Sequence, residues 1–168
     1  MPLYVDHQGP FHAIGSDGPL VVALMKRPID APLGTALGEV LGRTLRAHGN
    51  HIVYLHVTSL DTGGAADVAE VRKHYGDLMA RFSGTTGAIA LVAENDGFAG
   101  ALIRSAFTAV MAMGRSTIAG KAFSDVKEAA EWIEGAGRDK LVPNVPLART
   151  IVEAVASLRT IPTASRPR

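Results

Sequence analysis

The residues best placed to do chemistry are Asp61, Thr62, Gly63 and Gly64, which stand between a predicted strand and a predicted helix. The run 51–58 is short and rich in β-branched and aromatic residues, which is typical of a buried strand. The glycines allow a sharp turn into a helix N-terminus, whose free amides favour an anion. The turn is therefore a place for ligand binding or regulation. The simpler interpretation is a helix cap, in which the aspartate and threonine accept hydrogen bonds from those amides.

A second stretch, residues 114–121, has the sequence GRSTIAGK and is similar to a phosphate-binding loop. Its two glycines are separated by five residues rather than four. Ala122 stands where Ser or Thr would bind magnesium. The stretch also crosses a predicted strand instead of joining a strand to a helix. We therefore expect no nucleotide hydrolysis.

Six histidines raise the question of a metal site. His51 and His56 point to opposite faces of their strand, and His48 with His51 spans a predicted helix end. Solvated or core histidines are the expected explanation, because no carboxylate partners cluster with them. Asp61 and His56 could form an acid–base pair, but no third residue completes a catalytic group, and the G-x-S-x-G turn of hydrolases is absent. The sequence predicts no metal, no cofactor and no enzyme.

Composition narrows the class of protein further. The 168 residues are 47% hydrophobic, enough for a core, and we expect a single domain over 1–160 followed by a disordered tail over 161–168. A net charge of +1 and 5% aromatic residues argue against nucleic-acid binding. There is no cysteine and no signal-peptide pattern at the start, so a cytoplasmic location is expected. The most apolar run, 98–113, is shorter than the roughly 20 residues of a membrane span.

Alternating strand and helix signals follow along the chain. Residues 11–25 predict a hairpin around Asp17–Gly18, with a further edge strand at 3–5. Asp30 begins a helix that Gly49 ends. The later predicted elements are a helix over 65–82, a strand over 88–93, a helix over 98–113, a strand over 117–122, a helix over 125–133 capped by Ser124 and ended by Gly135 and Gly137, and a final helix from Pro146.

The predicted helix 98–113 has an apolar arc that covers more than half of its circumference. One face packed against a sheet cannot bury all of it. The final helix, a protein partner or an apolar ligand could cover the rest. The candidate residues for this interface or apolar pocket are Phe98, Leu102, Ile103, Phe107, Val110 and Met111.

The order of these elements resembles the STAS domain of anti-sigma factor antagonists and sulfate transporters. The resemblance covers 11–133 and is carried most clearly by AIALVAENDGFAG at 88–100 and AFSDVKEAAEWI at 122–133. It implies an α/β fold: a STAS-like mixed sheet of about five strands with an N-terminal hairpin and helices mainly on one face. The helix after Pro146 would be an extra C-terminal helix.

The resemblance also implies a function. STAS antagonists carry an Asp-Ser-Ser-Gly type motif whose hydroxyl is phosphorylated, and Asp61, Thr62, Gly63 and Gly64 stand at the corresponding place. We expect a bacterial, non-enzymatic domain that regulates by binding a protein partner or a second copy of itself as a homodimer. The sequence also resembles the broader set of bacterial proteins described as STAS/Sec14-like, which implies the alternative: a small-molecule or lipid-binding protein with an apolar pocket beside 98–113.

Substitutions at Thr62 separate a switch from a cap. Because phosphate adds roughly −1.5 to −2 charge, Thr62→Glu should weaken partner binding while leaving the melting temperature almost unchanged. Thr62→Ala should keep binding and lower the free energy of unfolding by about 1 kcal/mol at most. Thermal melting and a binding titration measure the two effects. Equal partner binding by the two variants would contradict the switch and support the helix-cap interpretation.

Overall fold

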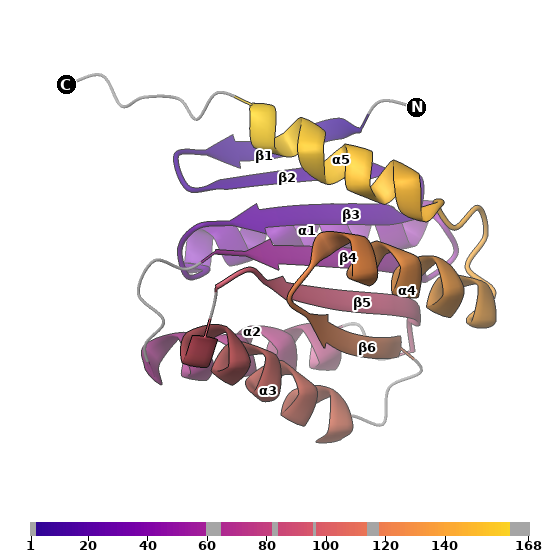
Figure 1. Cartoon of the computed structure of the whole chain (residues 1–168). Coiled ribbons are helices and arrows are strands. Elements are labelled where there is room, and N and C mark those ends of the chain that lie inside the picture. Colours follow the sequence, from indigo (N-terminus) through magenta and orange to yellow (C-terminus); the bar gives the residue numbers. More distant parts are fainter. Residues whose placement is uncertain (1–2, 60–64, 82–83, 96, 114–117, 162–168) are drawn as a thin grey trace.

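The computed structural model describes residues 3–59, 65–81, 84–95, 97–113 and 118–161, whose strands form one six-stranded sheet in the order β1 to β6 (Figure 1). The strands are β1 (Tyr4–Gly9), β2 (His12–Asp17), β3 (Leu20–Met25), β4 (His51–Thr58), β5 (Thr86–Ala93) and β6 (Ile118–Phe123). The helices are α1 (Ala31–Ala47), α2 (Ala65–Arg81), α3 (Gly97–Met113), α4 (Val126–Asp139) and α5 (Ala148–Thr160).

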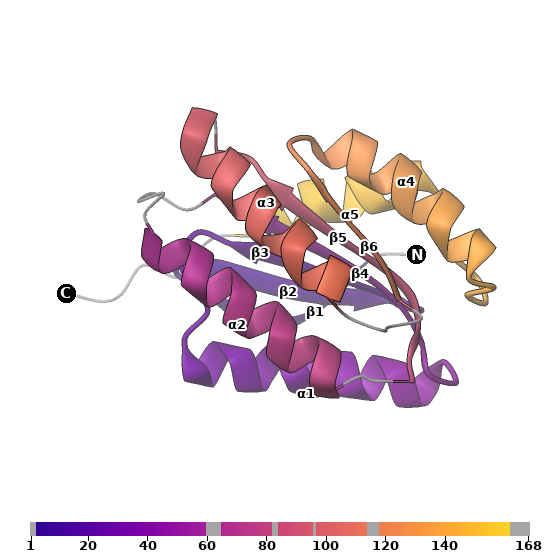
Figure 2. The ribbon, with the colours of Figure 1, turned by 90° about the horizontal axis from the view of Figure 1, so that it is seen from below.

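The pairing of neighbouring strands changes from antiparallel to parallel at β3. The first three strands pair antiparallel, whereas β3 to β6 pair parallel. Parallel neighbours require a crossover, and α1, α2 and α3 each supply one. Right-handed crossovers that advance in one direction across a sheet leave their helices on the same face. These three helices accordingly cover one face together (Figure 2).

The opposite face is covered by α4 and α5. The side chains of β4 show why both faces are covered. Val53, Leu55 and Val57 face the α4–α5 side, while Tyr54 faces the α1–α3 side. Both faces of the strand are apolar, so both must be covered. Among the described helices the division is three to two, more even than the predicted packing mainly on one face. The sheet has six strands, roughly as predicted, and the edge strand expected at 3–5 is β1 at Tyr4–Gly9.

Local signals placed the first half of the fold correctly. The hairpin of β2 and β3 turns at Gly18, whose φ of 54° is in the left-handed region. The Asp30 carboxylate accepts a hydrogen bond from the Leu33 amide at 2.9 Å, capping α1. Gly49, with φ of 63°, follows the last turn of that helix. These three predictions are confirmed.

The prediction for α4 was wrong at both ends. The cap is Asp125 and not Ser124, since the Asp125 carboxylate accepts hydrogen bonds from the amides at 127 and 128. The helix also continues past Gly135 and Gly137 to Asp139. A Cβ on Gly137 would lie 2.4 Å from Val145 Cγ2, so this glycine provides close packing with the following loop. Its role is tertiary, and it does not stop the helix.

Only the first residue of the predicted C-terminal tail is described by the structure. Of the predicted tail over 161–168, all residues after Ile161 lie outside the described residues. None of the described helices is long and apolar enough to span a membrane.

Two helical glycines give a matched test of the packing around α3. A Cβ on Gly100 would lie 2.0 Å from the carbonyl oxygen of Asn95, and backbone cannot yield easily. Gly100→Ala should therefore lower the free energy of unfolding by about 1–3 kcal/mol. Gly135 in α4 has nothing within 4 Å, so Gly135→Ala should raise it by about 0.5–1 kcal/mol. Urea unfolding measures both, and equal effects of the two substitutions would contradict the packing at Asn95.

Candidate functional site

The predicted switch at Asp61, Thr62, Gly63 and Gly64 lies outside the described residues. The flanking elements are described: β4 ends at Thr58, and α2 begins at Ala65, close to the predicted position. The segment thus joins the carboxyl end of a parallel strand to a helix start, as its sequence indicated. Its role as a phosphorylation site stays a prediction.

Three of the six candidate interface residues on α3 belong to the core. Ile103, Phe107 and Val110 are 1%, 0% and 8% exposed. The Phe107 ring contacts the ring of Tyr75 edge-on, with centroids 4.5 Å apart. These three side chains hold α3 against the sheet and α2, so they cannot contact a partner.

Leu102 and Met111 are half-buried. Met111 packs against β6, where a Cβ added to Gly120 would lie 2.2 Å from the methionine's methyl carbon. Gly120 therefore makes the room that Met111 fills. Both side chains border the outer face of α3 without forming its centre.

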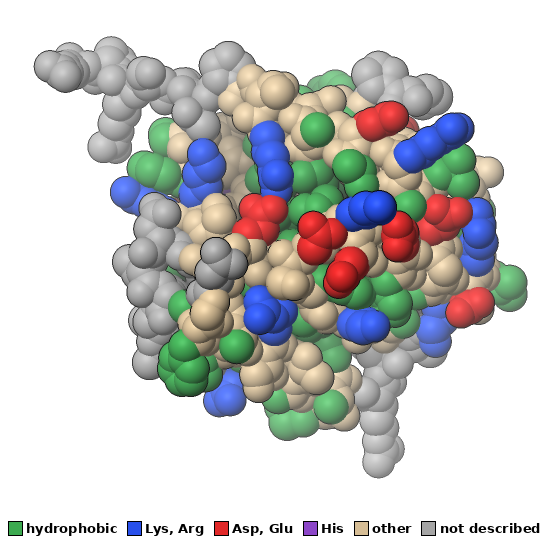
Figure 3. All heavy atoms as spheres, viewed as in Figure 1, with side chains coloured by type: hydrophobic (Ala, Val, Ile, Leu, Met, Phe, Trp, Pro, Cys, Tyr) green, Lys and Arg blue, Asp and Glu red, His purple; other side chains and the backbone are tan. Residues whose placement is uncertain are grey.

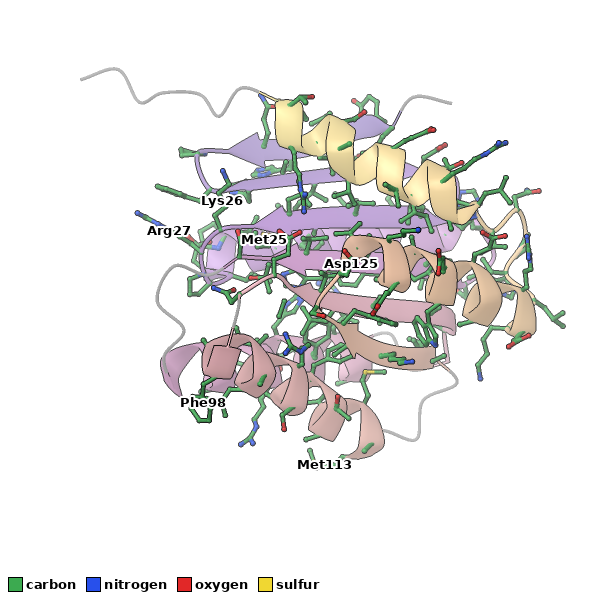
Figure 4. The ribbon with its side chains drawn as sticks, viewed as in Figure 1. Met25, Lys26, Arg27, Phe98, Met113 and Asp125 are labelled. Carbon is green, nitrogen blue, oxygen red and sulfur yellow. The ribbon has the colours of Figure 1, made fainter. Side chains whose placement is uncertain are left out.

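The outer face of α3 is exposed and uncharged. Phe98 is 79% exposed and Met113 78%, and both point away from the sheet at the two ends of the helix (Figure 4). Between them the exposed residues are Ala101, Ser105, Thr108, Ala109 and Ala112. The final helix does not cover this face, because α5 lies on the opposite side of the sheet (Figures 1 and 2). That alternative for the apolar arc is wrong.

A polar cluster that the sequence patterns did not identify lies in the core between β4 and α2. His56 Nδ1 and the Tyr75 hydroxyl are 2.8 Å apart and share a hydrogen bond. The ring of His74 meets the ring of His56 edge-on at 5.9 Å between centroids, and Tyr54 lies 6.1 Å away on the other side. We call Tyr54, His56, His74 and Tyr75 the histidine–tyrosine cluster.

Several polar atoms of the cluster are buried without a partner among the described residues. They are His56 Nε2, His74 Nε2 and the Tyr54 hydroxyl. An unmade hydrogen bond of a buried group costs about 1–3 kcal/mol. Three such atoms within one cluster are unusual for a core and mark the cluster as a candidate functional feature.

Burial decides the charge of the cluster. It lowers the pKa of His56 to about 3, with a smaller contribution from His74. It lowers the pKa of His74 to about 4, against the opposing effect of Asp77. Burial also raises the pKa values of Tyr54 and Tyr75 above their ordinary value. All four side chains are therefore neutral at pH 7. They can donate or accept hydrogen bonds, but they carry no charge that could neutralise a charged ligand.

The cluster reaches the surface through His74, in an open groove of about 710 Å³ between α1 and α2. Lys73, Asp77 and Arg81 line the same groove, so its walls carry both signs of charge. Among the described residues no three His, Cys, Asp or Glu side chains come together as a metal site. The groove can donate and accept hydrogen bonds, but it presents no activated nucleophile.

The sequence held a partial signal for the cluster. Tyr54 and His56 share a face of β4 because side chains alternate along a strand, and Tyr75 lies in the helix predicted over 65–82. Nothing local shows that a residue on β4 meets one nineteen positions later. Only the packing of the helix on the strand brings the two together.

Comparisons of the chain with protein-family models, with curated proteins and with solved structures give no match.

The cluster predicts a stability that falls in acid. The unfolded chain binds protons at its histidines below pH about 6.5, whereas folded His56 and His74 do not until pH is close to 4 or below. The free energy of unfolding should therefore be largest above pH 6.5 and fall as pH decreases from there. The limiting slope is about 1.4 kcal/mol per pH unit for each histidine.

Urea unfolding between pH 7.5 and pH 4.5, a range set about the ordinary histidine pKa, measures this slope. His56→Gln should make the slope shallower, because one of the two groups is gone. His48→Gln, at the C-cap of α1, controls for loss of a histidine elsewhere. A slope unaltered by His56→Gln would show that His56 is not kept neutral by burial.

Proposed function

We propose that this protein is a non-enzymatic, STAS-like regulatory domain of the anti-sigma factor antagonist type, which acts by binding a protein partner through the outer face of α3. The observation that carries the proposal is the exposed, uncharged surface between Phe98 and Met113. Exposed apolar patches on a helix are typical of protein interfaces. The order of strands and helices, with a hairpin followed by alternating parallel strands and helices, supports the STAS-like class.

A second copy of the chain is the partner that the spacing favours. Phe98, Ser105 and Ala112 recur at seven-residue intervals along α3 and form one line on its surface. Small residues along such a line allow two helices to approach closely. In a two-fold symmetric dimer with antiparallel α3 helices, Phe98 of each copy would cover the Ala112 end of the other.

The placement of α3 connects this face with the proposed switch. α2 and α3 pack side by side, and each begins where its preceding parallel strand ends. The start of α2, which follows Thr62 in the chain, therefore lies at the same edge of the sheet as Phe98. A phosphate carried there would add negative charge beside one end of the interface, which would weaken an apolar contact.

The alternative function, small-molecule binding, is supported by a cavity at the end of β3 and not by a pocket beside 98–113. The cavities at the α1–α2 groove, beneath Tyr54 and at the end of β3 contain no residue of α3. A pocket beside 98–113 therefore receives no support from them. The cavity at the end of β3 is the specific observation that favours ligand binding.

Loss of the Phe98 ring should dissociate the dimer. Burying a phenylalanine contributes about 1.5–3 kcal/mol and each dimer contains two, so Phe98→Ser should raise the dimer dissociation constant about a hundredfold or more. Ser105→Glu should have a similar effect, because Ser105 lies at the centre of that line and the two-fold symmetry brings its two like charges into one contact. Sedimentation equilibrium over a dilution series measures the dissociation constant.

Leu141→Ser is the matched control, since Leu141 is 81% exposed and lies beyond the end of α4. It removes a comparable apolar side chain and should leave the dimer unchanged. A chain that stays monomeric at high micromolar concentration would contradict self-association, as would a dimer that neither α3 variant weakens.

A further inference from the structure

A cavity of about 300 Å³ lies on the α5 side of the sheet, where β3, β4 and β5 end. Ligands of open α/β sheets bind outside the carboxyl ends of the parallel strands, which is where this cavity opens. Its volume is at the lower end of the roughly 300–1,000 Å³ typical of small-molecule pockets. Residues from the β1–β2 turn, from three strand ends and from the last turn of α5 line it.

The inner wall of the cavity is apolar and well ordered by packing. Val57 and Leu158 are 3% and 2% exposed, and they meet here from β4 and α5. Leu24 and Ile161 complete this wall nearer to the surface. A ligand that fills the cavity must therefore present an apolar body to it.

The rim of the cavity is cationic. Lys26 lines it, and Arg27 beside it lies over the ring of Phe11 at 3.5 Å from the ring centroid. Arg159 also lines the rim but is paired with Glu94, so these two charges offset each other. Figure 4 shows Met25, Lys26 and Arg27 together at the end of β3, and Figure 3 shows Lys and Arg side chains gathered at that end of the sheet.

The elements that form the cavity are held in place independently of any ligand. The Lys26 amide donates to the Phe11 carbonyl at 2.8 Å, and the Ser59 amide donates to the Met25 carbonyl at 3.0 Å. The Glu94–Arg159 ion pair ties the end of β5 to the end of α5. A cavity whose walls are fixed in this way costs little to order when a ligand binds.

We propose that this cavity binds a small amphipathic carboxylic acid, with its apolar chain against Leu24, Val57 and Leu158 and its carboxylate at Lys26. The site goes beyond the proposed function: it lies on the face of the sheet opposite α3, so failure of one proposal leaves the other standing.

Three probes with the same chain and different head groups test the class of ligand: octanoate, octanol and octylammonium. Calorimetric titration of the full chain should show octanoate binding most tightly, octanol more weakly and octylammonium weakest, because Lys26 attracts an anion and repels a cation. Equal affinities for the three probes would overturn the proposal, as would the absence of octanoate binding at millimolar concentration.

Two substitutions separate the head-group contact from the apolar wall. Lys26→Met should weaken octanoate binding about three- to tenfold, as expected for one partly solvated charge contact, and leave octanol binding unchanged. Lys140→Met, at the end of α4, makes the same change of charge away from the cavity and should alter neither. Leu24→Trp should fill the cavity from its half-exposed wall and abolish binding of both probes, while circular dichroism shows that the fold is kept. Equal effects of Lys26→Met and Lys140→Met would overturn the assignment of the carboxylate to Lys26.

Discussion

The burial of both faces of β4 and β5 is the constraint on which the rest of the structure depends. Residues of β4 face two separate apolar clusters, one under α1, α2 and α3 and the other under α4 and α5. Parallel strands joined by right-handed crossovers cover only one of these faces. The chain after β6 must therefore return over the other face, and α4 and α5 do so through residues such as Ile133 and Ile151, both fully buried.

The histidine–tyrosine cluster is the point at which this apolar core departs from simple packing. His56 is 5% exposed on the central strand β4, and its hydrogen bond to Tyr75 ties that strand to α2. Tyr75 also packs edge-on against Phe107, so one ring links β4, α2 and α3. A polar contact of this kind can specify how helices sit on a sheet, because an apolar replacement would accept more than one orientation.

The sheet separates the two surfaces to which we assign roles. The outer face of α3 is apolar and open because α5, the remaining helix, is needed on the opposite side. There α5 forms one wall of the cavity at the end of β3 through Leu158 and Arg159. Because α5 must cover the second face of the sheet, it does not cover the outer face of α3, and it forms part of the cavity on its own side. Any influence of one surface on the other would have to pass through the strands between them.

The sequence by itself determined the elements whose causes are local. Alternation in 51–58 gave the two faces of β4, Asp30 and Gly49 set the ends of α1, and Gly18 set the hairpin. Each depends on residues within a few positions of one another. The number of strands and the presence of a C-terminal helix followed in outline from the same patterns.

Tertiary structure alone decided what depends on contacts distant in sequence. Gly137 lies inside α4 and does not end it, and it leaves the space that the Val145 side chain fills. Ile103, Phe107 and Val110 are core residues and Phe98 is not, because α2 and the sheet cover one side of α3 only. The bond between His56 and Tyr75 and the cavity built from residues 8 to 161 have no local signal either. Periodicity shows that a helix has an apolar side, but which neighbour covers that side is settled only when the whole sheet is assembled.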